Sequence, residues 1–292
     1  MTVRFKHFVV TLFNLPLWKN DKNNCPTVTD KWLEERFRLF ESYCFPSLQA
    51  QTTSDFVWLV LFDENTPEPY KKRIESYKTL MPQFHSRFCS SEEAADFHHS
   101  DDNRNCRFIR EEIASLLEND EEFVLTTNVD NDDAIHREML QTLQTQFLAS
   151  PKETLYSLNI GLQYFPRLHV AMHMRYPHNH FLTLTERTDK DFRTVMFYGH
   201  TKARKLLPTV DILGKPYWLE VVHSCNVNND LRITSRIRYR CLWKSYSLQE
   251  YGLPLHFSFS SNLVNNLFYL PLYFCKVGIW RLKRKVRICF GR

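Results

Sequence analysis

The sequence predicts an α/β fold with a mostly parallel central sheet flanked by helices, and three observations lead to this class. Apolar runs of strand length alternate along the chain with segments whose apolar residues recur at helical spacing. One run, Phe56–Phe62, is apolar throughout, as expected of a parallel strand that is covered on both faces. The chain of 292 residues, 43% of them hydrophobic, can bury one large core. Strands that alternate with helices imply parallel pairing through right-handed crossovers.

The first half of the chain supplies most of the predicted sheet. Phe5–Phe13 is the first expected strand, and the chain must turn at Asn14-Leu15-Pro16. Thr29–Cys44 carries an apolar helical face behind a Thr29 or Asp30 cap, and Pro46 marks the expected end of this helix. The other elements expected here are a helix over Pro67–Leu80, a short strand over Phe84–Phe88, a helix over Arg107–Leu117 and a strand that opens at Phe123.

The second half is less regular. We expect a helix over Ala134–Leu148, and then strands over Thr154–Ile160, Phe181–Glu186 and Trp218–Val222. The aromatic, histidine-rich segment Tyr164–His180 allows no prediction of strand pairing. The pattern loosens beyond about residue 245, so we expect one domain over residues 1–245 and a basic, aromatic tail over residues 246–292.

Clustered carboxylates follow a short buried strand in the stretch FVLTTNVDNDDAIH. Asp130, Asp132 and Asp133 place three carboxylates in four positions. One of them could cap a following helix and Asp130 could open an Asx turn, but capping requires only one acid. The spacing excludes an EF-hand, because its required Gly and Glu are missing. Such a cluster at the open edge of an α/β sheet can bring a hard divalent cation and a diphosphate together.

The composition argues against phosphate binding by a glycine-rich loop. The chain has six glycines and contains neither G-x-G-x-x-G nor G-x-x-x-x-G-K-[ST], which argues against a dinucleotide site and a P-loop. A bound phosphate would therefore need a metal and side chains. Carboxylate oxygens suit Mg²⁺ or Mn²⁺.

Cysteine usage and the N-terminal segment indicate the compartment. The eight cysteines are scattered without a C-x-x-C pair, which favours free thiols in a reducing environment. Met1–Leu15 has no small-residue cleavage site and fits a core strand better than a signal peptide. We therefore expect a cytoplasmic protein.

Four segments carry a family resemblance that extends over roughly residues 5–235. They are PSLQAQTTSDFVWLVLFDENTP (Pro46–Pro67), LTTNVDNDDAI (Leu125–Ile135), FLTLTER (Phe181–Arg187) and WLEVVHSCNVNND (Trp218–Asp230). With these segments the chain resembles the putative rhamnosyltransferase family of bacterial glycosyltransferases. The resemblance implies the GT-A-like nucleotide-diphospho-sugar transferase fold.

The resemblance also implies roles for the acidic residues. In enzymes of that fold the acidic motif holds Mn²⁺ or Mg²⁺ against the diphosphate of the sugar donor. Asp130 with Asp132 or Asp133 would then be metal ligands, and His223 would be the distal ligand. The family tends to have Arg before the motif where this chain has Asn128, so a charge contact from that position is not expected.

Two further site roles follow from the chemistry and the architecture. Glycosyl transfer builds negative charge on the departing diphosphate, and an inverting enzyme needs a base for the acceptor hydroxyl. Glu186, at the end of FLTLTER, is the candidate base, although it could equally be a solvated residue that pairs with Arg187. By analogy with this architecture, the turn at Phe13 and Asn14 would receive the nucleotide base.

Basic and histidine residues before the acidic strand have two interpretations. Arg107 and Arg110 could reach a diphosphate, or could pair with Glu111 on the solvent face of their helix. His98–Asp102 has the composition of a metal site, but consecutive histidines in a polar loop are more often solvated.

The tail combines apolar residues with positive charge. From Lys276 onward it has seven Lys and Arg and no acid, which leaves 31 of the 38 bases against all 33 acids in the rest of the chain. Its longest apolar run, Leu267–Cys275, contains Pro271 and is too short to span a bilayer. We expect a helix on an anionic inner membrane surface; a core-docking helix with a solvated basic end is the alternative. Nucleic-acid binding is not expected, because the remainder is net acidic.

These observations lead to one leading hypothesis and two alternatives. The leading hypothesis is a metal-dependent, inverting glycosyltransferase at the inner face of the cell membrane. It would transfer a sugar from a nucleotide-diphosphate donor such as dTDP-rhamnose to a glycan or lipid-linked acceptor of a surface polysaccharide. The alternatives are a metal-dependent hydrolase of nucleotide sugars or phosphodiesters, and a non-catalytic sugar-nucleotide or glycan-binding protein.

Overall fold

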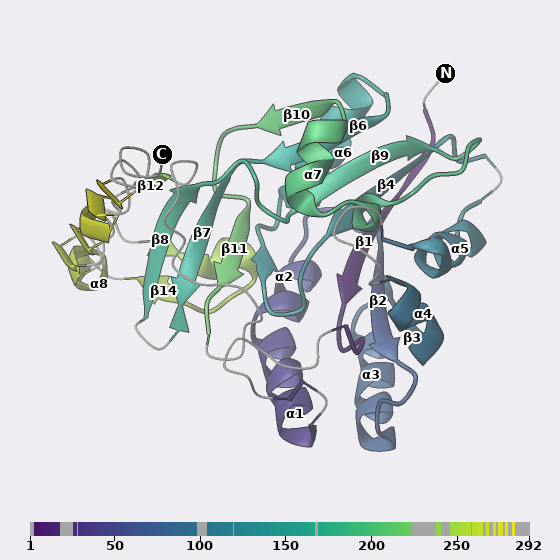
Figure 1. Cartoon of the computed structure of the whole chain (residues 1–292), viewed down its shortest axis with the longest axis horizontal. Coiled ribbons are helices and arrows are strands. Elements are labelled where there is room, and N and C mark those ends of the chain that lie inside the picture. The colour runs from purple at the N-terminus through teal and green to yellow at the C-terminus, as the bar shows by residue number, and fades with distance from the viewer. Residues whose placement is uncertain are drawn as a thin grey trace, which may run out of the picture.

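The chain folds around two neighbouring sheets, and the expected α/β class with a mostly parallel central sheet is confirmed (Figure 1). In this computed structural model the described residues are 3–17, 26–27, 29–97, 104–118, 120–166, 169–223, 238–240, 246–257, 259–264, 267–268, 271–272, 274–276, 278–279 and 282–283.

The central sheet has seven strands in the order β10-β6-β9-β4-β1-β2-β3. Only β9 runs antiparallel to its neighbours; the other paired strands of this sheet are parallel. The carboxyl ends of β1, β2 and β4 therefore lie at one edge. The strands are β1 (Phe5–Leu12), β2 (Val57–Asp63), β3 (Phe84–Cys89), β4 (Phe123–Asn128), β6 (Thr154–Leu158), β9 (Leu182–Arg187) and β10 (Thr209–Ile212).

Helices cover both faces of the central sheet because its strands send alternate apolar side chains to opposite sides. On β1, Val9 packs into one core cluster, whereas Phe8 and Val10 pack into the other. The first face is covered by α1 (Asp30–Leu39), the π-helix η1 (Phe40–Cys44), α2 (Phe45–Gln49), α3 (Glu68–Leu80) and α6 (Met139–Ala149). The second is covered by α4 (Ser91–Phe97), α5 (Arg107–Ser115), the 3₁₀-helix η3 (Val195–Phe197) and α7 (His200–Leu206).

The second sheet has five strands in the order β12-β8-β7-β11-β5 and lies beside the central sheet (Figure 1). Its strand β11 pairs in parallel with β7 and antiparallel with β5. The strands are β5 (Ala134–Ile135), β7 (Ile160–Phe165), β8 (Val170–Arg175), β11 (Trp218–Val221) and β12 (Arg238–Arg240). The remaining elements are the pair β13 (Tyr246–Ser247) and β14 (His256–Phe257), the 3₁₀-helix η4 (Leu248–Tyr251) and α8 (Phe259–Val264).

Three expected elements differ from the structure. The helix expected over Ala134–Leu148 begins only at Met139, because Ala134 and Ile135 pair with β11 instead. The strand expected over Thr154–Ile160 is divided at Asn159 between the two sheets. The helical path does not end at Pro46; this proline lies in the first turn of α2, where its missing N–H is tolerated.

The segments without a predicted pairing complete the second sheet and its core. Part of Tyr164–His180 forms β8, which pairs antiparallel with β7. Leu248, Tyr251 and Leu253, which the prediction places in the tail, are buried against Leu219 of β11. The packed part of the chain therefore extends at least to Leu253.

The close approach of β7 to Trp218 requires a glycine. A Cβ atom built at Gly161 would lie 2.1 to 2.3 Å from the Trp218 ring. That ring stacks on Phe181 at 5.1 Å between centroids, and its Nε1 donates to the Leu158 carbonyl at 2.7 Å. The indole is thus held on both sides and cannot move aside.

We predict that Gly161→Ala lowers the free energy of unfolding by about 3 kcal/mol, because the added methyl group overpacks a fixed ring. Urea unfolding would measure this loss. Gly278→Ala is the matched control, since no atom lies within 4 Å of its added Cβ, and it should change stability by less than about 1 kcal/mol. Equal effects of the two substitutions would contradict the packing argument.

A buried histidine lies within the central sheet. His7 Nε2 is hydrogen-bonded to Thr127 Oγ1 at 2.8 Å, and Gln144 Nε2 lies 3.4 Å from the other ring nitrogen. The Thr127 hydroxyl also bonds to Thr183 Oγ1 at 2.6 Å. Burial lowers the pKa of His7 to about 3, so the imidazole is neutral in the folded protein.

We predict that His7 makes stability fall in acid. The unfolded chain binds a proton at His7 below about pH 6.5, whereas the folded chain does not until about pH 3. The contribution of His7 should therefore decrease by about 1.4 kcal/mol per pH unit as the pH falls below about 6.5. Urea unfolding of the wild type and of His7→Gln from pH 7 to pH 4.5 would measure it. A difference between the two proteins that stays constant with pH would refute this prediction.

Candidate functional site

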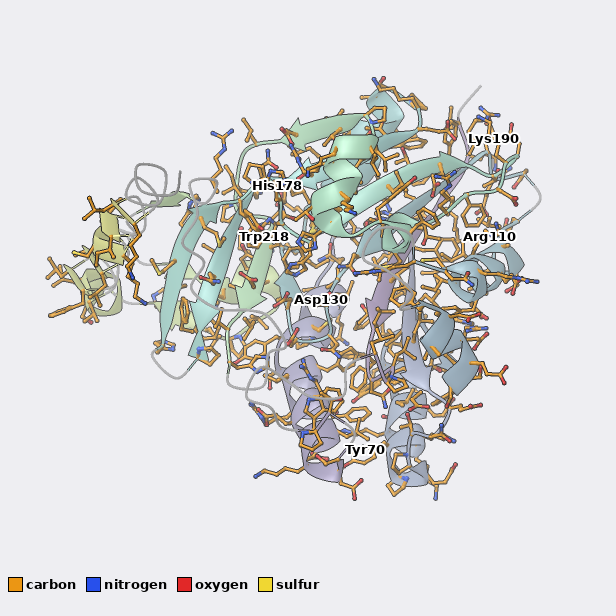
Figure 2. The ribbon with its side chains drawn as sticks, viewed as in Figure 1. Tyr70, Arg110, Asp130, His178, Lys190 and Trp218 are labelled. Atoms are coloured by element: carbon orange, nitrogen blue, oxygen red, sulfur yellow. The ribbon has the colours of Figure 1, made fainter. Side chains whose placement is uncertain are left out.

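The acidic loop, residues 129–133, leaves the carboxyl end of β4 and enters β5 of the second sheet. It is fixed to the neighbouring strand β1, because the Val129 amide donates to the Val10 carbonyl at 3.2 Å and Thr11 Oγ1 donates to the Val129 carbonyl at 2.8 Å. The three carboxylates thus lie where the chain passes from one sheet to the other, and Figure 2 shows Asp130 close to the centre of the molecule.

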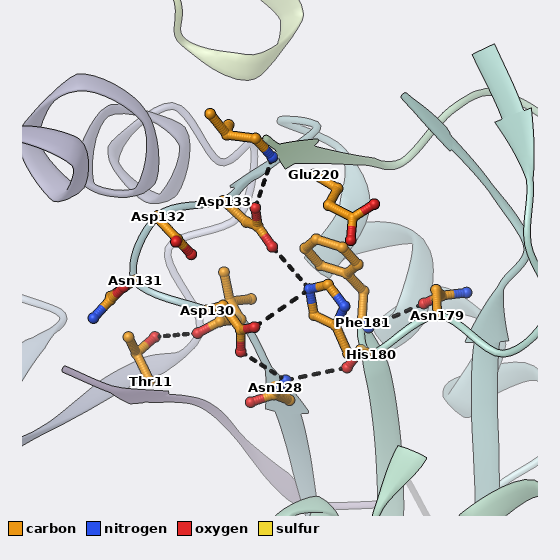
Figure 3. A network of polar contacts seen from close by, with 12 residues as sticks. Thr11, Asn128, Asp130, Asn131, Asp132, Asp133, Asn179, His180, Phe181 and Glu220 are labelled. Carbon is orange, nitrogen blue, oxygen red and sulfur yellow. Dashed lines mark hydrogen bonds and ion pairs between the residues drawn. The ribbon is translucent and has the colours of Figure 1, made fainter. Parts of the chain in front are cut away.

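Two of the carboxylates share a histidine that precedes β9. His180 Nε2 lies 2.8 Å from Asp133 Oδ2 and 3.6 Å from Asp130 Oδ2 (Figure 3). Asn128 Nδ2 donates to the His180 carbonyl at 3.2 Å and to Asp130 Oδ1 at 3.3 Å, and the Phe181 ring lies 4.2 Å from the imidazole. The position of His180 is therefore fixed by the end of β4 as well as by its own strand.

The charges of this group depend on one another. Burial opposes the charged form of His180, but Asp130 and Asp133 outweigh it and raise the pKa of His180 to about 9. Burial acts to raise the pKa of Asp133 and outweighs the hydrogen bond with His180, which acts to lower it; the nearby charge of Asp132 acts in the same direction as burial. Asp133 is also bonded through Oδ1, which accepts the Val221 amide of β11 at 2.8 Å.

The third carboxylate belongs to a different group. Asp132 Oδ2 accepts a hydrogen bond from Arg36 Nη1 of α1 at 2.7 Å and lies 2.9 Å from His223 Nε2. Burial would raise the pKa of Asp132, but the charge of Arg36 and the bond from His223 outweigh it and hold that pKa below its usual value. Asp132 is thus a buried anion with two basic partners.

The expected metal ligands are therefore divided into two groups. Among the described residues, Asp130, Asp133 and His180 offer one ligand atom each, and these atoms lie within 4.8 Å of one another. Two carboxylate oxygens and one imidazole nitrogen suit Mn²⁺. Asp132 and His223, which were also expected as metal ligands, instead contact each other, and Asp132 is bound by Arg36.

Sequence reasoning did not find His180 or Arg36. His180 lies in the histidine-rich segment whose pairing was not predictable, and it reaches the loop because β9 inserts beside β4. Arg36 lies 94 positions before Asp130, on a helix whose apolar face gave no sign of a polar contact. The strongest signal for His180 was its place directly before FLTLTER.

The residues expected to receive a nucleotide base lie next to the loop. Phe13 is buried, with its ring 4.6 Å from that of Phe37, and its carbonyl accepts Asn131 Nδ2 at 2.5 Å. Asn14 Oδ1 accepts the Asp63 amide at 3.1 Å, which joins the ends of β1 and β2. The contact between Phe13 and the acidic loop is therefore made by the Phe13 backbone carbonyl and not by its ring.

Glu186, the expected base, is not brought to the acidic loop. Because β9 is antiparallel to β4, Glu186 pairs with Val124 near the start of β4, at the opposite end from the loop. Its carboxylate accepts the amides of Arg193 and Thr194 at 2.9 and 2.8 Å, and burial raises its pKa. Its assignment as base stays a prediction that this register does not support.

The expected diphosphate contacts from α5 are occupied by other partners. Arg107 pairs with Glu111 at 2.7 Å, and Arg110 lies 3.4 Å from Asp191. Figure 2 shows Arg110 on the α5 side of the molecule, separated from Asp130. The expected loop His98–Asp102 lies outside the described residues.

Comparison with protein families gives a match over most of the chain. The family model described as putative rhamnosyl transferase matches residues 21–235. No curated protein matches the chain at a significant level.

Solved structures offer weaker likenesses. The S. aureus TarS 1-349 structure is 12% identical with a TM-score of 0.39, over 74% of this chain and 60% of that chain. A putative nucleotide-diphospho-sugar transferase from Desulfovibrio desulfuricans G20 is 9% identical with a TM-score of 0.36, over 75% of this chain and 82% of that chain. The inositol-1-phosphate CTP transferase from T. maritima is 11% identical with a TM-score of 0.36, over 75% of this chain and 89% of that chain. Likenesses at this level do not fix an activity.

Proposed function

The chain belongs to the putative rhamnosyl transferase family, and from this premise we propose that it is a metal-dependent glycosyltransferase that uses a nucleotide-diphosphate sugar. Its α/β fold, with a mostly parallel seven-stranded sheet, is of the GT-A-like class that this family implies. The observation that carries the proposal is the group of Asp130, Asp133 and His180 at the carboxyl edge of that sheet. In open α/β sheets, ligands bind at this edge.

The residues divide the work of binding the donor. Asp130, Asp133 and His180 would hold Mn²⁺ or Mg²⁺, which when bound neutralises charge on the departing diphosphate. The Val221 amide binds Oδ1 of Asp133, and this orients the other carboxylate oxygen, Oδ2, toward His180. The ends of β1 and β2, joined by Asn14, would take the nucleotide base, in line with the expected role of this turn.

The proposed reaction is a direct displacement. The acceptor hydroxyl attacks the anomeric carbon, the bond to the diphosphate oxygen breaks, and the configuration inverts. The hydroxyl proton must pass to a base, and Glu186, at the opposite end of β4 from the acidic loop, does not lie beside the cation group. The family description, rhamnosyl transfer, supports a deoxyhexose donor, for which we propose dTDP-rhamnose; the proposed acceptor is a glycan or lipid-linked acceptor of a surface polysaccharide.

We predict that UDP or dTDP binds this chain only in the presence of Mn²⁺. Asp130→Asn should weaken this binding at least tenfold, because it removes one of the anionic ligand oxygens. Isothermal titration with and without Mn²⁺ would measure the affinities. Asp189→Asn is the matched control, since Asp189 is exposed and pairs with Arg187, and it should bind as the wild type does.

Two results would count against the transferase proposal. One is that neither nucleotide binds. The other is that binding ignores both the metal and Asp130→Asn. Mn²⁺-dependent binding followed by release of free sugar without any acceptor would favour the hydrolase alternative instead.

The tail supports a second part of the proposal, which is association with an anionic membrane surface. In the described part of the tail, several large apolar side chains are more than half exposed: Leu267, Phe268, Leu272, Phe274, Ile279 and Leu282. They lie at helical positions between residues 267 and 282, and the seven Lys and Arg of the sequence follow from Lys276 onward. Within the described chain, no helix is both long enough and apolar enough to cross a membrane. Apolar side chains next to cations suit a helix that lies at the surface of an anionic bilayer.

We predict that Phe268→Asp/Leu272→Asp lowers binding to vesicles that contain anionic lipid at least fivefold, because it replaces exposed apolar side chains that would insert into the bilayer with negative charges that the anionic lipid repels. Vesicle pelleting would measure the bound fraction. Leu80→Asp/Leu206→Asp is the matched control, because these leucines are 59% and 61% exposed but lie on α3 and α7. Equal binding by the wild type and the tail variant would refute the membrane role.

A further inference from the structure

A line of buried hydrogen bonds crosses the acidic loop from the first sheet to the second. It begins at the Phe13 carbonyl after β1, which accepts Asn131 Nδ2 at 2.5 Å. Arg36 Nη1 then donates to Asn131 Oδ1 at 3.2 Å and to Asp132 Oδ2 at 2.7 Å. The same Asp132 oxygen lies 2.9 Å from His223 Nε2, just beyond the end of β11. The Arg36 guanidinium thus connects Asn131 to Asp132 within this line of hydrogen bonds.

Arg36 is held rigidly in its place. Its side chain is only 6% exposed, and the guanidinium lies 5.0 Å from the centroid of the Trp32 ring. Its helix α1 is capped by Thr29, whose side chain accepts the Trp32 amide, and the next residue, Phe37, packs on Phe13. A buried guanidinium is costly to desolvate unless its partners are fixed and well aligned, so this contact is a strong constraint on the loop.

The geometry separates Asp132 from the cation ligands. Its Oδ2 atom is shared by Arg36 and His223, whereas Asp130 and Asp133 converge on His180. A divalent cation at Asp132 would have to lie against the positive guanidinium, which is unfavourable at this depth. Arg36 therefore keeps one of the three carboxylates of the loop, Asp132, apart from the two that converge on His180.

We infer that Arg36 is a positioning residue for the cation site: it holds Asp132 as an anchor and thereby fixes Asp130 and Asp133 in the arrangement that binds the metal. This inference rests on the proposed function, since it assigns the site its cation. Neither Arg36 nor its partner Asn131 touches the cation group, so both act through the loop backbone. Lys could supply the charge at this position but not the planar guanidinium that lies against Trp32 and whose Nη1 donates to both Asn131 and Asp132.

The test measures Mn²⁺ binding to the full chain without nucleotide, by isothermal titration and by the electron paramagnetic resonance signal of free Mn²⁺. Arg36→Met should raise the Kd for Mn²⁺ at least tenfold. Arg38→Met is the matched control on the same helix; Arg38 is exposed and pairs with Glu35, and the Kd should stay within twofold of the wild type. Circular dichroism and thermal unfolding of each variant would establish that it is folded.

A double-mutant cycle separates positioning from ligation. Asp132→Asn should weaken Mn²⁺ binding about as much as Arg36→Met, and the double variant should be no worse than either, because both remove the same anchor. If Asp132 were itself a ligand, Asp132→Asn would cost far more than Arg36→Met and the two effects would add. That result would overturn the inference.

Other outcomes are equally decisive. A folded Arg36→Met variant that binds Mn²⁺ like the wild type overturns this inference alone. A wild-type chain that binds no Mn²⁺ overturns the proposed metal dependence and the inference with it. Where Arg36→Met does not fold, Arg36→Lys takes its place: it keeps the charge but not the planar guanidinium, and at least a threefold rise in Kd is expected. Unchanged affinity in Arg36→Lys then overturns the inference.

Discussion

Three carboxylates in four consecutive positions repel one another, and the rest of this structure depends on how that repulsion is compensated. Each acid of the loop has a different environment. Asp132 is bound by Arg36 and His223, and Asp133 by His180 and a backbone amide of β11. Asp130 faces His180 from the more open side. These partners come from α1, from the residues just before β9 and from β11 with the residues just after it, so the loop can form only when both sheets are in place.

The junction of the two sheets is therefore also the site. The loop leaves one sheet at β4 and joins the other at β5, and β11 contacts it through both a strand pairing and the Val221 amide. Trp218 on the same strand is locked by Gly161 and Phe181, and Phe181 follows His180 directly. Packing between the sheets thus sets the position of the histidine that meets the carboxylates. A substitution in the second sheet should therefore shift the acidic loop, even where the substituted residue does not itself contact a ligand.

The sequence was sufficient to predict the alternating strands and helices of the central sheet and the place of the acidic loop after β4. Strands such as Phe56–Phe62 are recognisable because burial on both faces demands an unbroken apolar run. The partners of the loop were not predictable, because they depend on long-range register. His180 reaches Asp133 only because β9 inserts antiparallel beside β4, and the same insertion takes Glu186 to the far end of that strand. Arg36 reads from sequence as one more charge on an amphipathic helix, and only the packing of α1 buries it.

Exposure decides from which side a ligand can reach the cation group. The side chain of Asp130 is 49% exposed, that of His180 is 11% exposed, and that of Asp133 is fully buried. A ligand must therefore approach past Asp130, with Asp133 as the floor of the group. Asn14, at the turn after β1, lies at the same edge of the central sheet, because β1 and β4 are parallel neighbours. A nucleotide diphosphate that enters from this side can place its base near the end of β1 and its phosphates over Asp130. Under the proposed function, the sugar would then point toward the second sheet, and the acceptor would bind there.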